Sequence, residues 1–195
     1  MPTDIYWQAG NMLSPLPVVL VSCGNEEIGT NLFTVAWAGT VCTQPAMVSI
    51  SVRPSRHSYD LIRQTGEFVI NLTNRSLLRA TDWCGVVSGR DTNKWLQTGL
   101  TPVCGRTVGA PYVAESPLSI ECKVKQVLEL GSHHMFLADV TAVRVDGRYV
   151  DDVSGALDLS RCQLITYMHG GYYEVGKKIG FFGYSVQKKR KTRKR

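Results

Sequence analysis

Alternating and continuous apolar stretches, separated by short polar turns, run along most of this chain and predict a protein built mainly from strands. We expect strands at residues 16–22, 31–38, 47–53, 67–72, 118–130, 135–146 and 160–167. The pattern predicts helices only over residues 56–65, 76–84 and 92–98. Many strands with few helices favour a closed or partly closed antiparallel sheet over a doubly wound parallel one. The chain has no Gly-x-Gly-x-x-Gly turn between a strand and a helix, so a Rossmann nicotinamide domain is not supported.

The third predicted strand leads directly into a turn whose side chains suit an anion. Pro54 cannot donate a hydrogen bond to a sheet, so the strand is expected to end there, with Ser55 placed to cap the next helix. The turn combines helix N-terminal amides with the hydroxyls of Ser55 and Ser58 and the cations of Arg53 and Arg56. Such a set of hydrogen-bond donors and cations favours the binding of a phosphate. The alternative is that Ser55 only caps the helix and that both arginines are solvated.

The second predicted strand carries Asn31 and Trp37 among small and apolar residues. An aromatic ring with an amide nearby can hold a planar heterocycle. The alternative is that Trp37 is an ordinary core residue. The sequence of this strand leaves both interpretations open.

Taken together, the motifs of this chain resemble the flavin reductase-like, FMN-binding split-barrel family. The resemblance covers nearly the whole chain, and the combination is more specific than any single motif. It rests on Asn31 with Ala36 and Trp37, Ser51–Tyr59 (SVRPSRHSY), Gly66–Leu72 (GEFVINL), 79–95 (RATDWCGVVSGRDTNKW), 115–124 (ESPLSIECKV), 131–140 (GSHHMFLADV) and 167–185 (YMHGGYYEVGKKIGFFGYS).

The resemblance implies a mainly β, Greek-key split barrel with a few short helices, which binds FMN. The residues that it implies for the cofactor site are Asn31, Ala36, Trp37, Arg53, Ser55, Arg56, Ser58, Asn71, Lys94 and His133. Ser132 stands where the family commonly has Asp, and Asp139 where it commonly has Glu, so roles tied to those carboxylates are not carried over. His169 fits either a contact with substrate or a neighbouring subunit, or an ordinary surface turn.

The chemistry that the resemblance implies belongs to the flavin, because the chain shows no Gly-x-Ser-x-Gly elbow, no His-Glu-x-x-His and no Cys-His constellation. We expect an FMN-binding oxidoreductase that reduces flavin or a small electron acceptor with NADH or NADPH. The alternative is a non-catalytic FMN carrier that shuttles electrons between protein partners. The adjacent His133 and His134 lack a third ligand, so no metal site is expected. Family resemblance also implies a homodimer with FMN near the interface.

Length and charge divide the chain into one domain, residues 1–187, and a basic tail, residues 188–195. The net charge of +6 comes from the tail, which has seven basic side chains; the remainder carries 15 Lys and Arg against 16 Asp and Glu. A charge block of this kind is typical of a disordered end. Nucleic-acid binding is the alternative, but the domain lacks an interleaved basic and aromatic stripe.

Cysteine spacing and the absence of a long apolar run predict where the protein works. The six cysteines show no Cys-x-x-Cys pair and no metal-ligand spacing, which favours reduced thiols. No basic segment followed by an apolar run opens the chain, and no apolar stretch approaches the roughly 20 residues of a membrane span. We therefore expect a soluble cytoplasmic protein.

Overall fold

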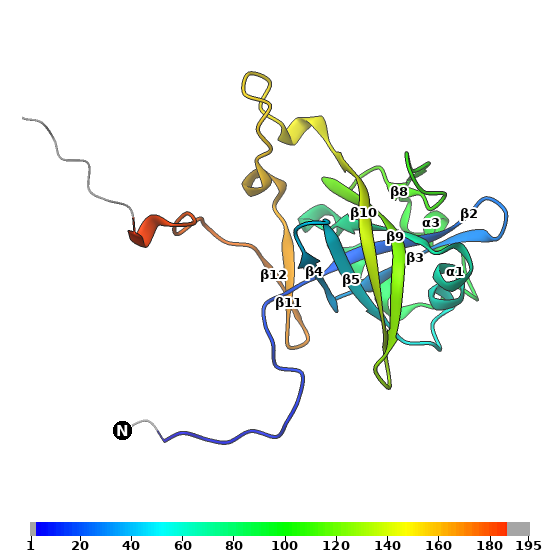
Figure 1. Ribbon diagram of the computed structural model, residues 1–195, viewed down its shortest axis with the longest axis horizontal. Helices are drawn as coiled ribbons and strands as arrows, with labels where there is room; N and C mark the ends of the chain where they lie inside the picture. Colours follow the sequence, from blue (N-terminus) through cyan, green and yellow to red (C-terminus); the bar gives the residue numbers. More distant parts are fainter. Residues whose placement is uncertain (1–2, 187–195) are drawn as a thin grey trace, which may run out of the picture.

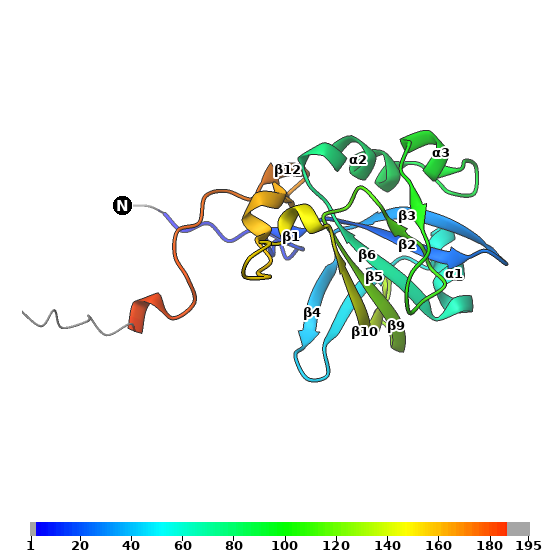
Figure 2. The same cartoon turned by 90° about the horizontal axis from the view of Figure 1, so that it is seen from above.

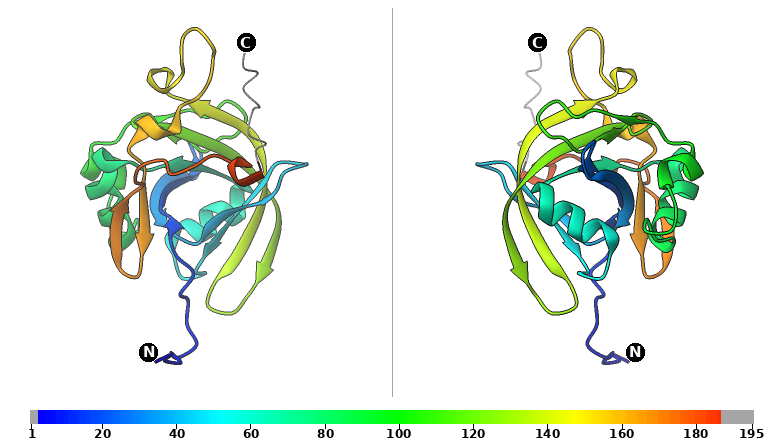
Figure 3. Two further views of the ribbon diagram at one scale, coloured as in Figure 1. Left: turned by 90° about the vertical axis from the view of Figure 1, so that its left-hand side faces the viewer. Right: turned by 90° about the vertical axis from the view of Figure 1, so that its right-hand side faces the viewer.

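A curled antiparallel sheet of seven strands forms the body of the protein in the computed structural model, which describes residues 3–186 (Figure 1). The strand order is β3-β2-β6-β9-β10-β5-β4. The strands are β2 (Val19–Asn25), β3 (Gly29–Val35), β4 (Ala38–Cys42), β5 (Met47–Val52), β6 (Glu67–Leu72), β9 (Leu118–Glu129) and β10 (His134–Val145). Figure 3 shows how this sheet curls, with the helix α1 (His57–Thr65) lying across one end of it. The expected mainly β architecture is confirmed.

Smaller elements complete the described chain. The strands β1 (Leu16–Pro17), β11 (Ile165–Met168) and β12 (Gly171–Glu174) form a second sheet, and β7 (Pro102–Val103) pairs with β8 (Tyr112–Val113). Two more helices are α2 (Leu78–Val86) and α3 (Lys94–Thr98). Short 3-10 turns lie at Arg75–Leu77, Gly147–Tyr149, Leu159–Cys162 and Tyr184–Val186.

The strand β2 is buried on both faces and therefore divides the core in two. Val19 and Val21 point into the curl, together with apolar residues of the other strands and of α1. Leu20 points outward against Trp95 and other residues of the α2 and α3 region. Alternating side chains of a strand face opposite sides of a sheet, so one continuous apolar run serves both clusters. Figure 2 shows α2 and α3 covering the outer side of β2 and β3.

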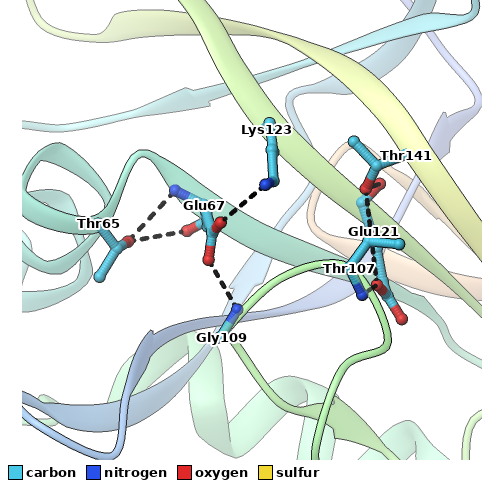
Figure 4. A network of polar contacts seen from close by, with 7 residues as sticks. All are labelled: Thr65, Glu67, Thr107, Gly109, Glu121, Lys123 and Thr141. Atoms are coloured by element: carbon cyan, nitrogen blue, oxygen red, sulfur yellow. Dashed lines mark hydrogen bonds and ion pairs between the residues drawn. The ribbon is translucent and has the colours of Figure 1, made fainter.

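Two buried or partly buried glutamates anchor the loop between β7 and β8 to the sheet (Figure 4). Glu121, 2% exposed, accepts hydrogen bonds from the amides of Arg106 (2.8 Å) and Thr107 (2.6 Å) and from the Thr107 hydroxyl (2.6 Å). Burial opposes its ionisation, but these donors outweigh burial and lower the pKa of Glu121. Glu67 accepts from the Gly109 amide at 2.7 Å. The loop is therefore fixed by charge-assisted bonds.

The observed elements depart from the predicted ones in several places, including the predicted strand 16–22, which is divided into β1 and β2, and the unpredicted short strands β7 and β8. The predicted strand 31–38 ends at Val35, and Ala36 and Trp37 form a bend before β4, which was not predicted. The exposed sequence of β4 has no buried alternating face that would have marked it as a strand. The predicted strand 160–167 begins only at Ile165, because residues 159–162 form a 3-10 turn. The strand β12 was not predicted either, because it forms by pairing with β11.

Both ends of the described chain extend away from the body (Figure 1), and both carry exposed apolar side chains. Tyr6 and Trp7 are exposed in the N-terminal segment, and Ile179 and Phe182 are fully exposed near the other end. Among residues 3–186, no helix combines the length and apolar character needed to cross a bilayer. The predicted basic tail, 188–195, lies outside the described residues.

Candidate functional site

A cleft of about 750 Å³ beside α1 brings together nine of the ten predicted site residues. We call it the cationic cleft. Residues from β3, from the bend that follows it, from the β5–α1 turn, from α3 and from the loop before β10 line it. The nine are Asn31, Ala36, Trp37, Arg53, Ser55, Arg56, Ser58, Lys94 and His133. These residues are distant in sequence, so the fold itself assembles the cleft.

The predicted cap of α1 is wrong. The N-cap is Arg56, which has an extended backbone, and within the described chain no side chain caps the helix. Ser55 is exposed, and its carbonyl oxygen accepts a hydrogen bond from Arg90 Nη1 at 3.0 Å. The amides of the first helical turn therefore lack a side-chain acceptor. The Tyr59 amide donates to the Arg56 carbonyl oxygen at 3.0 Å, which leaves the amides of His57 and Ser58 for an anion.

Asn31 joins three walls of the cleft. It is 4% exposed, and its Nδ2 donates to Ser58 Oγ at 2.7 Å, which links β3 to the first turn of α1. Gly89, in the loop after α2, lies against the same amide: a Cβ at this position would be 2.3 Å from Asn31 Oδ1. Only glycine fits there without displacing Asn31. The loop after α2 is thus held close to the strand that carries Asn31.

The lining of the cationic cleft carries four basic side chains and, among the described residues, no Asp or Glu. Lys94 is 3% exposed and donates from Nζ to the Cys84 carbonyl oxygen at 2.7 Å. Burial lowers the pKa of Lys94, and nearby Arg56 lowers it further. Arg90 lies 3.9 Å from the Asp60 carboxylate, a long and exposed ion pair. A buried ammonium without a carboxylate partner favours an anionic ligand.

An aromatic pair forms another wall of the cleft. The rings of Trp37 and His133 lie 6.5 Å apart, centroid to centroid, with their planes inclined by 30°. Burial lowers the pKa of His133, and the cations of Arg53 and Arg56 add to this effect. The imidazole is therefore neutral at pH 7, because its ordinary pKa is already 6.5. These rings offer a planar ligand a flat, uncharged surface.

His134 and Asn71 point elsewhere. His134 Nδ1 lies 2.8 Å from the Tyr59 hydroxyl, and His134 does not line the cleft, whereas His133 does. Within the described part of the chain, no three His, Cys, Asp or Glu side chains gather as a metal site would need. Asn71 is 0% exposed; its amide donates to Ser22 Oγ (3.0 Å), and its Oδ1 accepts from the Val113 amide (2.9 Å). The structure therefore uses Asn71 to join strands and does not bring it to the cationic cleft.

Sequence reasoning missed the residues that the α2–α3 loop and β11 contribute. The run 79–95 was recognised as a family motif, but only Lys94 was assigned to the site. The small residues Ser88 and Gly89 before Arg90 are the signal that could have indicated a ligand loop. Tyr167 gave no such signal. The additional lining residues include Thr34, Gly85, Val87, Ser88, Gly89, Arg90 and Tyr167.

Comparisons with known proteins identify the family. The flavin reductase like domain matches residues 12–176, so the chain belongs to the flavin reductase like family. An uncharacterized protein of Aeropyrum pernix is 32% identical over 143 residues, 73% of this chain and about half (52%) of that relative's length. The uncharacterized protein YddH of Escherichia coli is 28% identical over 188 residues, covering 92% of this chain and 96% of YddH.

Solved structures agree on the fold. The flavoredoxin of Desulfovibrio vulgaris (Miyazaki F) has a TM-score of 0.88 at 30% identity, covering 95% of this chain and 100% of that one. A protein of Shewanella frigidimarina described as a candidate flavin reductase with split barrel domain has a TM-score of 0.76 at 25% identity, covering 85% of both chains. The expected split barrel is confirmed.

Proposed function

We propose that this protein is an FMN-dependent oxidoreductase that takes electrons from NADH or NADPH and passes them to flavin or another small acceptor. The observation that carries the proposal is the cationic cleft. It joins four basic side chains, an uncapped helix N-terminus and an aromatic wall, and no acidic side chain of the described chain lines it. FMN is a planar ring with a phosphate dianion, which matches this combination of charge and shape.

The donor set of the cleft fits FMN. Arg53, Arg56 and Ser58, with the first amides of α1, would hold the phosphate. Trp37 and His133 would line the ring, and the neutral imidazole can hydrogen-bond without adding charge. Bound flavin supplies the transfer of hydride or single electrons, whereas the protein binds, orients and tunes it. We assign no separate catalytic acid, base or nucleophile.

The phosphate assignment is tested by comparing FMN with riboflavin, which lacks the phosphate. Calorimetry is expected to give tighter binding of FMN. Arg53→Ala should weaken FMN by about 1.5–3 kcal/mol, roughly tenfold to 150-fold, and leave riboflavin unchanged. Arg79→Ala, an exposed arginine outside the cleft, is the matched control. Equal affinities for FMN and riboflavin would contradict the assignment.

A second candidate function is supported by the likeness to flavoredoxin. In this case FMN would carry electrons between protein partners, without a substrate of its own. Anaerobic mixing of the FMN-loaded protein with NADH and with NADPH separates the two functions. Rapid bleaching of the flavin by a nicotinamide alone supports the reductase. Reduction only through a partner protein supports the carrier.

We further propose a homodimer, supported by the apolar side chains that both terminal segments expose. Ile5 and Tyr6 lie at one end of the described chain, and Ile179 and Phe182 at the other. A second copy would bury them, and burial of apolar surface drives most protein–protein association. Light scattering that finds a flavin-replete monomer would refute the dimer.

The cytoplasm is the proposed compartment, because it would keep the thiols reduced. All six cysteines are free. Burial raises the pKa of Cys23 to about 12 and that of Cys84 to about 11, so both remain protonated thiols. Mass spectrometry after alkylation of protein from freshly lysed cells is expected to find these cysteines unoxidised.

A further inference from the structure

A second pocket, of about 370 Å³, adjoins the cationic cleft. We call it the arm pocket. Residues 7–12 and 14 of the N-terminal segment form one side, and the tip of the β11–β12 hairpin forms another. Trp37 and Tyr167 line both the arm pocket and the cationic cleft, so the two sites share an aromatic border. Figure 1 shows the N-terminal segment running past the hairpin tip.

The lining of the arm pocket is aromatic and polar but carries no fixed charge. No Lys, Arg, Asp or Glu of the described chain lines it, and its titratable groups are His169 and the Tyr167 phenol. Trp7, Trp37 and Tyr167 supply aromatic surface, whereas Asn11 supplies an amide. Phosphate groups would find no cation here, and desolvating them without a partner is unfavourable. The lining therefore selects against a nucleotide and for an uncharged aromatic molecule.

The hairpin places His169 at a fixed point of the arm pocket. His169 and Gly170 are the two turn residues between β11 and β12, and both have positive φ (46° and 90°), as in a type I′ hairpin. Such turns favour Asn, Asp or Gly, so a histidine there is an unusual choice that brings an imidazole to the pocket. The hairpin is anchored by the pairing of Leu16 with Tyr167 and by the hydrogen bond from Tyr172 to Asp82.

We propose that the arm pocket binds an uncharged planar aromatic electron acceptor of the quinone class, stacked near Trp37 and Tyr167 and hydrogen-bonded by His169. The size of the pocket agrees, because 370 Å³ is near the lower end of the range of about 300–1,000 Å³ for small-molecule sites. A one- or two-ring compound suits this volume, whereas a dinucleotide does not. The assignment as an acceptor site rests on the proposed function, because it requires FMN in the adjoining cationic cleft.

The test compares 1,4-naphthoquinone with its charged 2-sulfonate, using the FMN-loaded full-length protein in the oxidised state. Equilibrium dialysis is expected to show tighter binding of the uncharged quinone. Trp7→Ala and His169→Asn should each weaken it by about threefold to tenfold, the range for one aromatic contact or hydrogen bond. Asn tolerates the positive φ of the turn, so the hairpin is kept. Tyr173→Ala, on the same hairpin but outside the pocket, is the control.

The outcomes separate this inference from the proposed function. FMN affinity, measured on the same preparations, should be equal in all variants. Unchanged quinone affinity in both Trp7→Ala and His169→Asn, or equal affinity for the sulfonate, would overturn the arm pocket as an acceptor site. Weaker quinone binding that follows only from dissociation of a dimer would overturn it as well, since the pocket would then be a subunit contact. Failure of the unmodified protein to bind FMN would instead overturn the proposed function.

Discussion

Replacing Lys94 with methionine should raise or preserve the stability of the FMN-free protein while weakening FMN binding. Methionine keeps an unbranched stem of similar length and removes the ammonium, which is 3% exposed and has no carboxylate among the described residues of the cleft. Burial lowers the pKa of Lys94 below its ordinary value of 10.5. The folded state therefore binds this proton less tightly than the unfolded state does. The charged lysine opposes folding at neutral pH, and this penalty falls as the pH rises through the folded pKa.

The change in unfolding free energy of Lys94→Met is the sum of two opposing terms. The variant loses the 2.7 Å hydrogen bond to the Cys84 carbonyl, a charged bond of about 1.5–3 kcal/mol. It also removes the desolvation penalty of the ammonium, and burial is the largest cause of the lowered pKa of Lys94. Because this penalty opposes the lost bond and is the larger of the two terms, we expect a net change between zero and about 2 kcal/mol in favour of the variant. FMN should lose a charged contact, about tenfold to 150-fold in affinity.

Urea denaturation of the FMN-free protein and calorimetric titration with FMN measure the two effects. Lys125→Met, on the exposed side of β9, is the matched control and should change neither quantity appreciably. The stability gain of Lys94→Met should shrink when denaturation is repeated near pH 10. A loss of more than about 3 kcal/mol in unfolding free energy, together with unchanged FMN affinity, would refute the reasoning and make Lys94 a structural lysine.

Three further outcomes are expected. Glu121→Gln should lower the unfolding free energy by about 1.5–3 kcal/mol in urea denaturation without changing FMN affinity, because a charged acceptor of the Thr107 amide and hydroxyl is lost; an unchanged midpoint would contradict this. Phe181→Asp combined with Phe182→Asp should give monomers with weaker FMN retention in light scattering, whereas a flavin-replete dimer would place the interface elsewhere. Truncation after Val186 should leave fold, FMN content and oligomeric state intact, and loss of flavin would show that the removed tail contributes.

Four strands, β5, β6, β9 and β10, could be predicted from the sequence to within one residue at each end. The predicted strand 67–72 coincides with β6, and 118–130 is within one residue of β9. Hydrophobic burial determines both the pattern and the strand, so the pattern is sufficient there. The edge strand β4 is exposed, and β12 is a strand because it pairs with β11. Neither carries a local signal, and tertiary pairing decides both.

The candidate site, too, could be predicted from the sequence only in part. The place of the β5–α1 turn in the cleft could be predicted because its basic and hydroxyl side chains lie in consecutive residues. Its details could not: the helix begins at His57 with Arg56 as N-cap, so Ser55 is left outside as an exposed turn residue. Arg90 and Tyr167 reach the cleft only after the α2–α3 loop and β11 have folded back. Family resemblance located Lys94 and His133 but placed Asn71 in the site, where the structure makes it a link between strands.

The pairing of β1 with β11 has a consequence for the order in which a newly made chain acquires its site. Asn31 and the β5–α1 turn emerge early from the ribosome, but Tyr167, which pairs with Leu16 and lines the cationic cleft, emerges more than a hundred residues later. An interrupted chain would therefore carry the β5–α1 turn without Tyr167, which lines the same cleft. Because a ligand stabilises only the state that binds it, the ligand of this cleft would protect finished chains and leave incomplete ones to proteolysis.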